Sequence, residues 1–375
     1  MTVPTTARED AITPDFPGLD DPPVPAPPQE DSAAHSWFFD SGNAVARFGL
    51  ALLVAAAIFS VFMLIKGVNP ITAYGDMIHS TFRSPKQIGE ILIRATPIML
   101  AGLAVAIPAR AGLINVGGEG QLIVGGIAAA GVALNTGGMP AGLVVVLMII
   151  AAAAAGAVWA GIAAVLRMWV DINEAVTTLL LNYVAIDLLG FLIYSPWKDA
   201  NGSGQPTTPI LAVAARLPVI GSSRVHIGIF IAVGMAIVTA VILKRTSWGF
   251  RLRVTGGNPE AAKRAGMRVG TLLLSAMLVG GLMAGLGGFA QYAGAEFKLR
   301  PGFCATYGYL GFLASWLAGH RPIGVAGAAI LLSAIAIGGD SLQIDAGLPA
   351  ASVNILIALV LLAMFGLKKR NGASA

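Results

Sequence analysis

The chain has 375 residues, of which 56% are hydrophobic and only 11% are charged, and its mean hydropathy is +0.78. A soluble domain with a charged surface does not have this composition, so the sequence predicts a multi-pass membrane protein. The formal net charge is +5, but the basic residues do not form one folded soluble face, which argues against a nucleic-acid partner. A single cysteine, Cys304, excludes a disulfide or a cysteine metal site within one chain.

Residues 1–43 differ from the rest, because they contain eight prolines and eight acidic residues against one base, Arg8. This composition predicts a disordered cytoplasmic tail. The segment has neither a basic start nor an early apolar core, so we do not interpret it as a secretory signal peptide.

Residues 44–370 are predicted to form an all-α transmembrane domain. Runs of apolar residues long enough to cross about 30 Å of hydrocarbon, at ~20 residues each, occur at about ten positions. They are 46–65, 91–109, 113–134, 141–166, 175–194, 227–243, 272–292, 303–318, 323–337 and 353–367. Within 280–288, small residues recur at four-residue spacing, which predicts close helix packing.

Positive charge sets the expected orientation. The loop 244–270 contains seven basic residues against one acid, Glu260, and residues 368–370 are Lys-Lys-Arg. With ten spans and the amino terminus inside, both clusters fall in the cytoplasm, as the positive-inside rule prefers. The carboxyl terminus is then also inside, and the Pro-, Gly- and Ser-rich loop 195–225 is outside. Lys66, Arg83 and Lys86 fall on the outer side in this scheme.

Residues 114–121 read Ile-Asn-Val-Gly-Gly-Glu-Gly-Gln. The glycines permit unwound backbone, which a membrane tolerates only where it lines a cavity or packs on protein. An acid inside a membrane is costly, so Glu119 suggests a function there. We take Glu119 and the nearby amides Asn115 and Gln121 as candidates for a substrate pathway. Alternatively, Arg110, Asn115 and Glu119 mark the wet cytoplasmic end of a helix.

A second candidate is the polar stripe of Glu174, Thr178 and Asn182, which repeats every four residues and shares one helix face. These side chains either line a path for a hydroxyl-rich solute or form hydrogen bonds between helices without a ligand. Asp187 lies off this stripe, deep in the same apolar run.

A short helix is predicted inside the loop 244–270. Asn258 can cap its first amides, Pro259 fits its first position, and Glu260 complements its positive end. Gly266 can end it after roughly two turns, which is too short to be stable alone. We therefore expect it to couple to a second protein, through Gly257, Asn258, Pro259, Glu260, Ala261, Ala262 and Gly266.

The chain has no phosphate-binding loop, because no lysine is followed by Ser or Thr. If ATP drives the protein, another subunit must bind it. The four histidines are scattered without paired spacing, so we predict no metal site, no bound cofactor and no catalytic residues.

These motifs carry a family resemblance. Residues 88–343 resemble the membrane permeases of bacterial ABC importers in the ribose, branched-chain amino acid and nucleoside group. The stretches 115–121 and 173–183 resemble the branch for nucleosides or simple sugars, and 257–267 resembles the coupling segment that seats in the ATPase. Asp187 and the acidic tail depart from the family pattern.

The resemblance implies a permease subunit of an ABC importer in the bacterial cytoplasmic membrane, in contact with membrane lipid. Its implied partners are two ABC ATPase subunits that use ATP, a second, similar or identical permease, and an extracytoplasmic solute-binding protein. The alternative is a secondary transporter of a small polar solute, driven by an ion gradient, with Glu119 or Asp187 as the coupling acid. A non-transporting scaffold is a third hypothesis.

Overall fold

The computed structural model describes residues 36–369 apart from residues 203, 345 and 350. Two compact units divide the chain, Met1–Gly49 and Leu50–Ala375. The described part of the first unit is the first half of α1, which begins at Ser36, inside the predicted tail. The rest of that tail, residues 1–35, lies outside the described residues.

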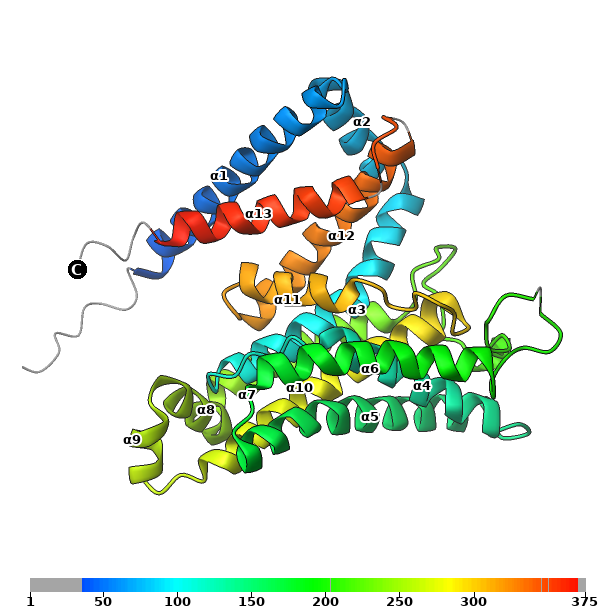
Figure 1. Ribbon diagram of the computed structural model, residues 1–375, viewed down its shortest axis with the longest axis vertical. Coiled ribbons are helices and arrows are strands. Elements are labelled where there is room, and N and C mark those ends of the chain that lie inside the picture. Colours follow the sequence, from blue (N-terminus) through cyan, green and yellow to red (C-terminus); the bar gives the residue numbers. More distant parts are fainter. Residues whose placement is uncertain (1–35, 203, 345, 350, 370–375) are drawn as a thin grey trace, which may run out of the picture. The chain divides into compact units, whose positions relative to one another are not determined.

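Thirteen α-helices form in the described part of the chain, together with a 3₁₀ turn and a π-helical turn (Figure 1). The first helices are α1 (Ser36–Ile65), α2 (Pro70–Phe82), α3 (Pro85–Ala109), α4 (Gly118–Asn135), α5 (Ala141–Val170) and α6 (Glu174–Tyr194). They are followed by η1 (Val213–Ala215), α7 (Gly228–Arg245), α8 (Ser247–Gly257), α9 (Pro259–Arg264), α10 (Val269–Gln291), η2 (Tyr292–Glu296), α11 (Tyr307–Leu317), α12 (Pro322–Ile344) and α13 (Ala351–Lys369).

The protein is an all-helical, multi-pass membrane protein. Among the described residues, six helices are long and apolar enough to cross a bilayer: α3, α5, α6, α7, α10 with η2, and α12. The pair α1 and α2, bent by 117°, could add a seventh. Each of the ten predicted apolar runs overlaps a helix, but α4 loses length to an unwound start and α11 has only 11 residues. The predicted count of ten spans therefore stays a prediction.

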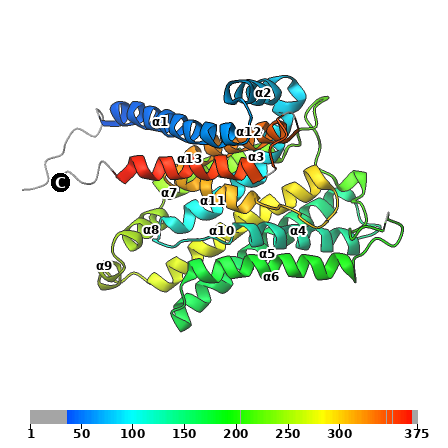
Figure 2. The ribbon, with the colours of Figure 1, turned by 45° about the horizontal axis from the view of Figure 1, so that its top comes forward.

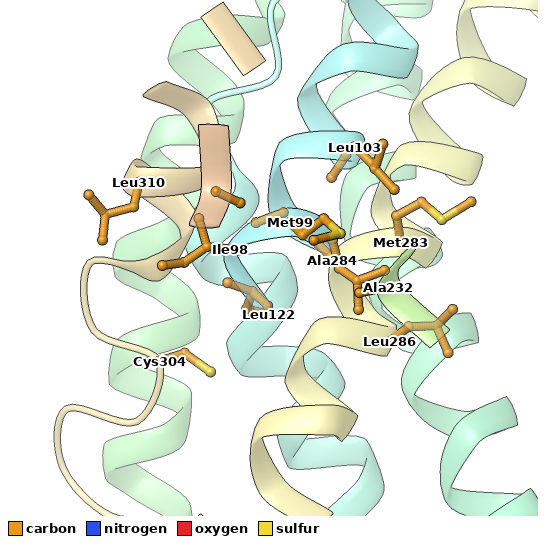
Figure 3. Packing of buried hydrophobic residues seen from close by; sticks show 14 of the residues in the cluster. Ile98, Met99, Leu103, Leu122, Ala232, Met283, Ala284, Leu286, Cys304 and Leu310 are labelled. Atoms are coloured by element: carbon orange, nitrogen blue, oxygen red, sulfur yellow. The ribbon is translucent and has the colours of Figure 1, made fainter. Parts of the chain in front are cut away.

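The core of the second unit is built around α3, which packs against α10, α11 and α12. Its residues Ile98, Met99 and Leu103 are completely buried. Helix α3 presents apolar residues on every side, and Figure 3 shows these three among side chains of α4, α7, α10 and α11. These neighbours include Leu122, Ala232, Met283, Ala284, Leu286 and Leu310.

Small residues bring α10 against α5, as the spacing in 280–288 predicts. A Cβ built on Gly285 would overlap the carbonyl oxygen of Ala152, and one on Gly281 would overlap that of Gly156. Because no side chain separates the two backbones, this packing tolerates only glycine at these positions.

Candidate functional site

An unwound segment, residues 111–117, connects α3 to α4. Two of its backbone N–H groups donate hydrogen bonds to side chains on the buried face of α6. The Ile114 N–H donates to Oε1 of Glu174 at 3.0 Å, and the Val116 N–H donates to Oγ1 of Thr178 at 3.1 Å. Glu174 and Thr178 are only 4% and 1% exposed. Because buried amides without partners are costly, these two side chains permit the helix to open here.

Asn182 continues the same stripe one turn further along α6. Its Oδ1 accepts the Gly120 N–H at 2.8 Å, and its Nδ2 donates to the Val116 carbonyl at 3.0 Å. The side chain is completely buried. It therefore ties the unwound segment and the first turn of α4 to α6.

Asn115 and Gln121 pair across the unwound turn. The Asn115 Nδ2 donates to Oε1 of Gln121 at 3.1 Å, and the Gln121 Nε2 donates to Oδ1 of Asn115 at 2.9 Å. Asn115 also donates to the Ala104 carbonyl of α3 and accepts the Gly117 N–H, each at 3.0 Å. Both amides are completely buried, so they fix the course of the segment.

Glu119 joins α4 to the start of α11. Its Oε1 accepts the Thr306 N–H at 2.6 Å, and its Oε2 accepts the Gly308 N–H at 2.7 Å. The residue is only 3% exposed. A carboxylate is favoured there because unpaired amides and the helix dipole make a helix N-terminus positive.

Glu174 has a counter-ion at the end of α5. The Arg167 guanidinium forms a salt bridge with its carboxylate. The buried carboxylate thus receives a cation and a backbone amide, which together offset its desolvation.

All six predicted pathway residues therefore lie in one connected polar cluster that joins α4, α6, α11 and residues 111–117. The alternative prediction, that Asn115 and Glu119 lie at the solvated cytoplasmic end of a helix, does not fit these two residues, because both are buried. Hydrogen bonds within the chain use all three side chains of the stripe on α6, as the second interpretation of its pattern expects, and the substrate pathway stays a prediction. Asp187, in contrast, lies on the exposed side of α6.

The short helix in the loop 244–270 forms as α9. The Asn258 Oδ1 accepts the Ala261 N–H at 3.0 Å, Pro259 occupies the first turn, and Gly266 follows the end with φ +77°. The predicted capping is confirmed. Glu260 forms an exposed ion pair with Lys263 at 3.0 Å, so α9 presents both charges to solvent.

Helix α8, which precedes α9, is not among the elements predicted from the sequence. Its N-terminal signal was present, because the Thr246 Oγ1 accepts the Gly249 N–H at 3.2 Å. At its other end, a Cβ on Gly256 would overlap the Arg110 carbonyl oxygen and lie 3.0 Å from the Gly112 nitrogen. Helix α8 thus contacts the chain where α3 ends and the unwound segment begins.

A cavity of about 130 Å³ borders the same end of the unwound segment. His320, in its wall, has a left-handed backbone with φ +58°, and its carbonyl accepts Nη2 of Arg110 at 2.8 Å. The cavity is large enough for one small ring. It is lined by Val105, Ala109, Gly112, Leu113, Ile114, Trp316 and His320.

Comparison with known proteins supports the resemblance. Residues 87–365 match the family described as branched-chain amino acid transport system, permease component. The chain is 38% identical over 324 residues to the glucose ABC transporter permease protein TsgB13 of Haloferax volcanii, covering 84% of this chain and 85% of that protein. It is 32% identical over 321 residues to the guanosine ABC transporter permease protein NupP of Bacillus subtilis, covering 84% and 90%.

A third relative is the nucleoside ABC transporter permease protein NupB of Lactococcus lactis, 29% identical over 321 residues, covering 83% of this chain and 88% of that protein. A family match across most of the chain identifies the molecule as a transport subunit rather than an ATPase. The chain belongs to this family of ABC transporter permeases.

Proposed function

We propose that the chain is one of two permease subunits of an importer that carries a nucleoside or a simple sugar into the cell. The glucose, guanosine and nucleoside permeases among its relatives support this substrate class. The observation that carries the mechanism is the contact of Gly256 in α8 with Arg110 and Gly112. Through that contact, a partner that moves α8 and α9 also moves the unwound segment.

We propose ten spans with both termini in the cytoplasm of a bacterial cell, and the cytoplasmic membrane as the location. Positive charge in 244–270 supports this orientation. Figures 1 and 2 show α8 and α9 at one end of the helices of the second unit and the connection between α6 and α7 at the other. This arrangement agrees with a cytoplasmic 244–270 and an outer 195–225.

The polar cluster has a structural part in the proposed pathway. Five of its six side chains hold residues 111–117 open, and Glu119 ties the following turn to α11, so that backbone rather than a regular helix contributes to the wall of the path. Ile114 is 42% exposed, which places one residue of this segment at the surface of the chain. The cluster comprises Asn115, Glu119, Gln121, Glu174, Thr178 and Asn182.

The proposed partners follow from this mechanism. ATP binding closes a pair of ATPase subunits on α9, through Gly257, Asn258, Pro259, Glu260, Ala261, Ala262 and Gly266. A second permease completes the path, and an extracytoplasmic binding protein delivers the solute. This chain itself binds no cofactor in the proposed scheme.

Uptake in cells or vesicles that contain the chain with its ATPase, second permease and binding protein tests the proposal. We expect uptake of labelled guanosine or glucose that stops when ATP is depleted and resists an ionophore. Uptake that survives ATP depletion but collapses with the ionophore would instead establish the secondary transporter.

A second measurement tests the coupling helix. Glu260→Lys removes the carboxylate at the positive end of α9 and repels Lys263. We expect the variant to insert normally and to lose coupling between ATP hydrolysis and uptake, whereas Glu90→Gln, in an exposed ion pair with Arg224, should transport normally. Normal coupled uptake by Glu260→Lys would contradict the proposed docking of α9.

A further inference from the structure

Helix α6 has a second polar feature on the side opposite its buried stripe. Tyr183, Asp187, Phe191 and Tyr194 follow each other at spacings of four, four and three, so they share one face. The three aromatic side chains are 58%, 64% and 65% exposed, and Asp187 is exposed as well. This set of four residues is called the Asp187 face below.

Asp187 lies near the middle of a membrane span. Helix α6 has 21 residues, and Asp187 is about 5 Å along the axis from its midpoint. A carboxylate in hydrocarbon is costly, and intramembrane acids almost always face a water-filled path or another protein element. Contact with lipid tails explains why the Phe191 side chain is exposed, but it does not explain the exposure of the Asp187 carboxylate.

The described helices leave this face open. Helix α6 packs against α4 and α5, its buried residues lie on the other side, and Figure 2 shows it along one edge of the group. Within the described residues, Asp187 forms no ion pair.

We propose that the Asp187 face binds the transported solute inside the pathway and recognises it as a ring that carries neighbouring hydroxyl groups. This inference rests on the proposed import function. A carboxylate has several acceptor sites and no donor, so it pairs with two hydroxyls at once. Tyr183 and Tyr194 supply rings that cover the apolar side of a sugar or base and hydroxyls that form further hydrogen bonds.

The chemistry fits both solutes suggested by the relatives. A ribose and a hexose each carry adjacent hydroxyls and need no cation from the protein. An ion pair with a second permease would use the same carboxylate differently, as would proton coupling. The ion pair and the proton coupling each predict a different effect of replacing Asp187 by Asn.

The test compares Asp187→Asn with the parent chain in the assembled transporter, using guanosine against 2′-deoxyguanosine and glucose against 2-deoxyglucose. Removing a charge-assisted hydrogen bond should raise the KM of the parent solute roughly tenfold to hundredfold. The parent chain should discriminate against the deoxy solute, and the variant should lose most of that discrimination. Asp76→Asn, at an exposed position of α2, is the matched control and should change neither value.

Three outcomes overturn the proposal. An unchanged KM in Asp187→Asn means that the carboxylate does not contact the solute. An equal loss for hydroxylated and deoxy solutes points to a role in assembly, such as an ion pair with the second permease. Sensitivity of uptake to an ionophore that disappears in Asp187→Asn identifies Asp187 as a proton-coupling acid.

A measurement on the unaltered transporter covers the case in which the variant does not insert. A hydrophobic carbodiimide should label Asp187, and saturating guanosine or glucose should protect it while Asp76 reacts as before. Labelling that neither solute affects, in a transporter that takes one of them up, contradicts the Asp187 face alone. Absence of uptake of any nucleoside or simple sugar contradicts the proposed function itself.

Discussion

The Glu119 carboxylate accepts the backbone N–H of Gly308 across 2.7 Å, which joins the first turn of α4 to the first turn of α11. Gly308 is required for this approach, because a Cβ there would overlap the backbone nitrogen of Glu119. Two helix N-termini that repel each other as dipoles therefore share one carboxylate. Since α4 follows the unwound segment directly, motion of that segment should reach α11 through Glu119.

Glu119→Gln tests this connection. The amide has one acceptor oxygen and no charge, so one of the two amides of α11, from Thr306 or Gly308, loses its partner. We expect the purified protein to lose roughly 1–3 kcal/mol of stability, measured by thermal unfolding in detergent, and uptake to fall. Glu90→Gln is the control, because its ion pair with Arg224 is exposed and should contribute less than about 1 kcal/mol. Equal unfolding temperatures for the two variants would refute the connection.

Thr178→Val tests the support of the unwound backbone by α6. Valine keeps the shape of threonine but cannot accept the Val116 N–H, which it leaves without that partner at a cost of about 1–3 kcal/mol. Thr178→Ser should restore most of the stability. Thr177→Val is the matched control, because among the described residues the Thr177 hydroxyl bonds only to the Asn173 carbonyl of its own helix end. If both valine variants unfold at the same temperature, Thr178 does not support the segment.

Features that depend on local contacts could be predicted from the sequence. The spacing of Glu174, Thr178 and Asn182 indicated one face, and the cap at Asn258 formed as its neighbours predicted. Such features depend on residues within one or two turns, so a linear pattern contains them.

Other features depend on contacts between distant segments. Glu119 meets Thr306 and Gly308 across 187 and 189 positions in the chain, and no local spacing encodes that partnership. Hydropathy located the ten apolar runs but not the ends of the helices. Helix α4, for example, begins only at Gly118, inside the run 113–134, and the polar residues Glu119 and Gln121 lie in its first turns. The approach of Gly256 to Arg110 is likewise a product of tertiary packing.

The stability of the segment between α6 and α7 should depend on pH through His226. This residue lies between α6 and α7, is completely buried, and accepts the Gly228 N–H with Nδ1 at 3.2 Å. Burial lowers the pKa of His226 to about 4, from 6.5 in an exposed chain. Between these two values the unfolded chain binds a proton that the folded chain does not. The free energy of unfolding should therefore fall as the pH drops from 6.5 to about 4, by roughly 1.4 kcal/mol per pH unit.

Thermal unfolding at several pH values checks this dependence. His226→Gln stays neutral, so the difference in unfolding temperature between parent and variant should shrink or change sign as the pH falls. His79→Gln, at an exposed position of α2, should follow the parent curve. Parallel curves for the parent chain and His226→Gln would show that His226 does not titrate as its burial requires.

Gly256→Ala tests whether α8 transmits motion to the pathway. The added methyl group would overlap the Arg110 carbonyl oxygen and crowd the Gly112 nitrogen at 3.0 Å. Since both obstacles are backbone, α8 must move away from the end of α3, and the two should then move independently. We expect the assembled transporter to keep hydrolysing ATP while uptake falls about tenfold or more, in line with the loss that a displacement of about 1 Å can cause in a site built for precise positioning.

Gly270→Ala is the control at the end of the same loop, because its methyl group would meet Met168 at an ordinary 3.6 Å. Measuring ATP hydrolysis and solute uptake on the same vesicles decides the question: a parallel fall in both activities means that the substitution disturbs ATPase docking, and unchanged uptake means that α8 does not transmit the motion through Gly256.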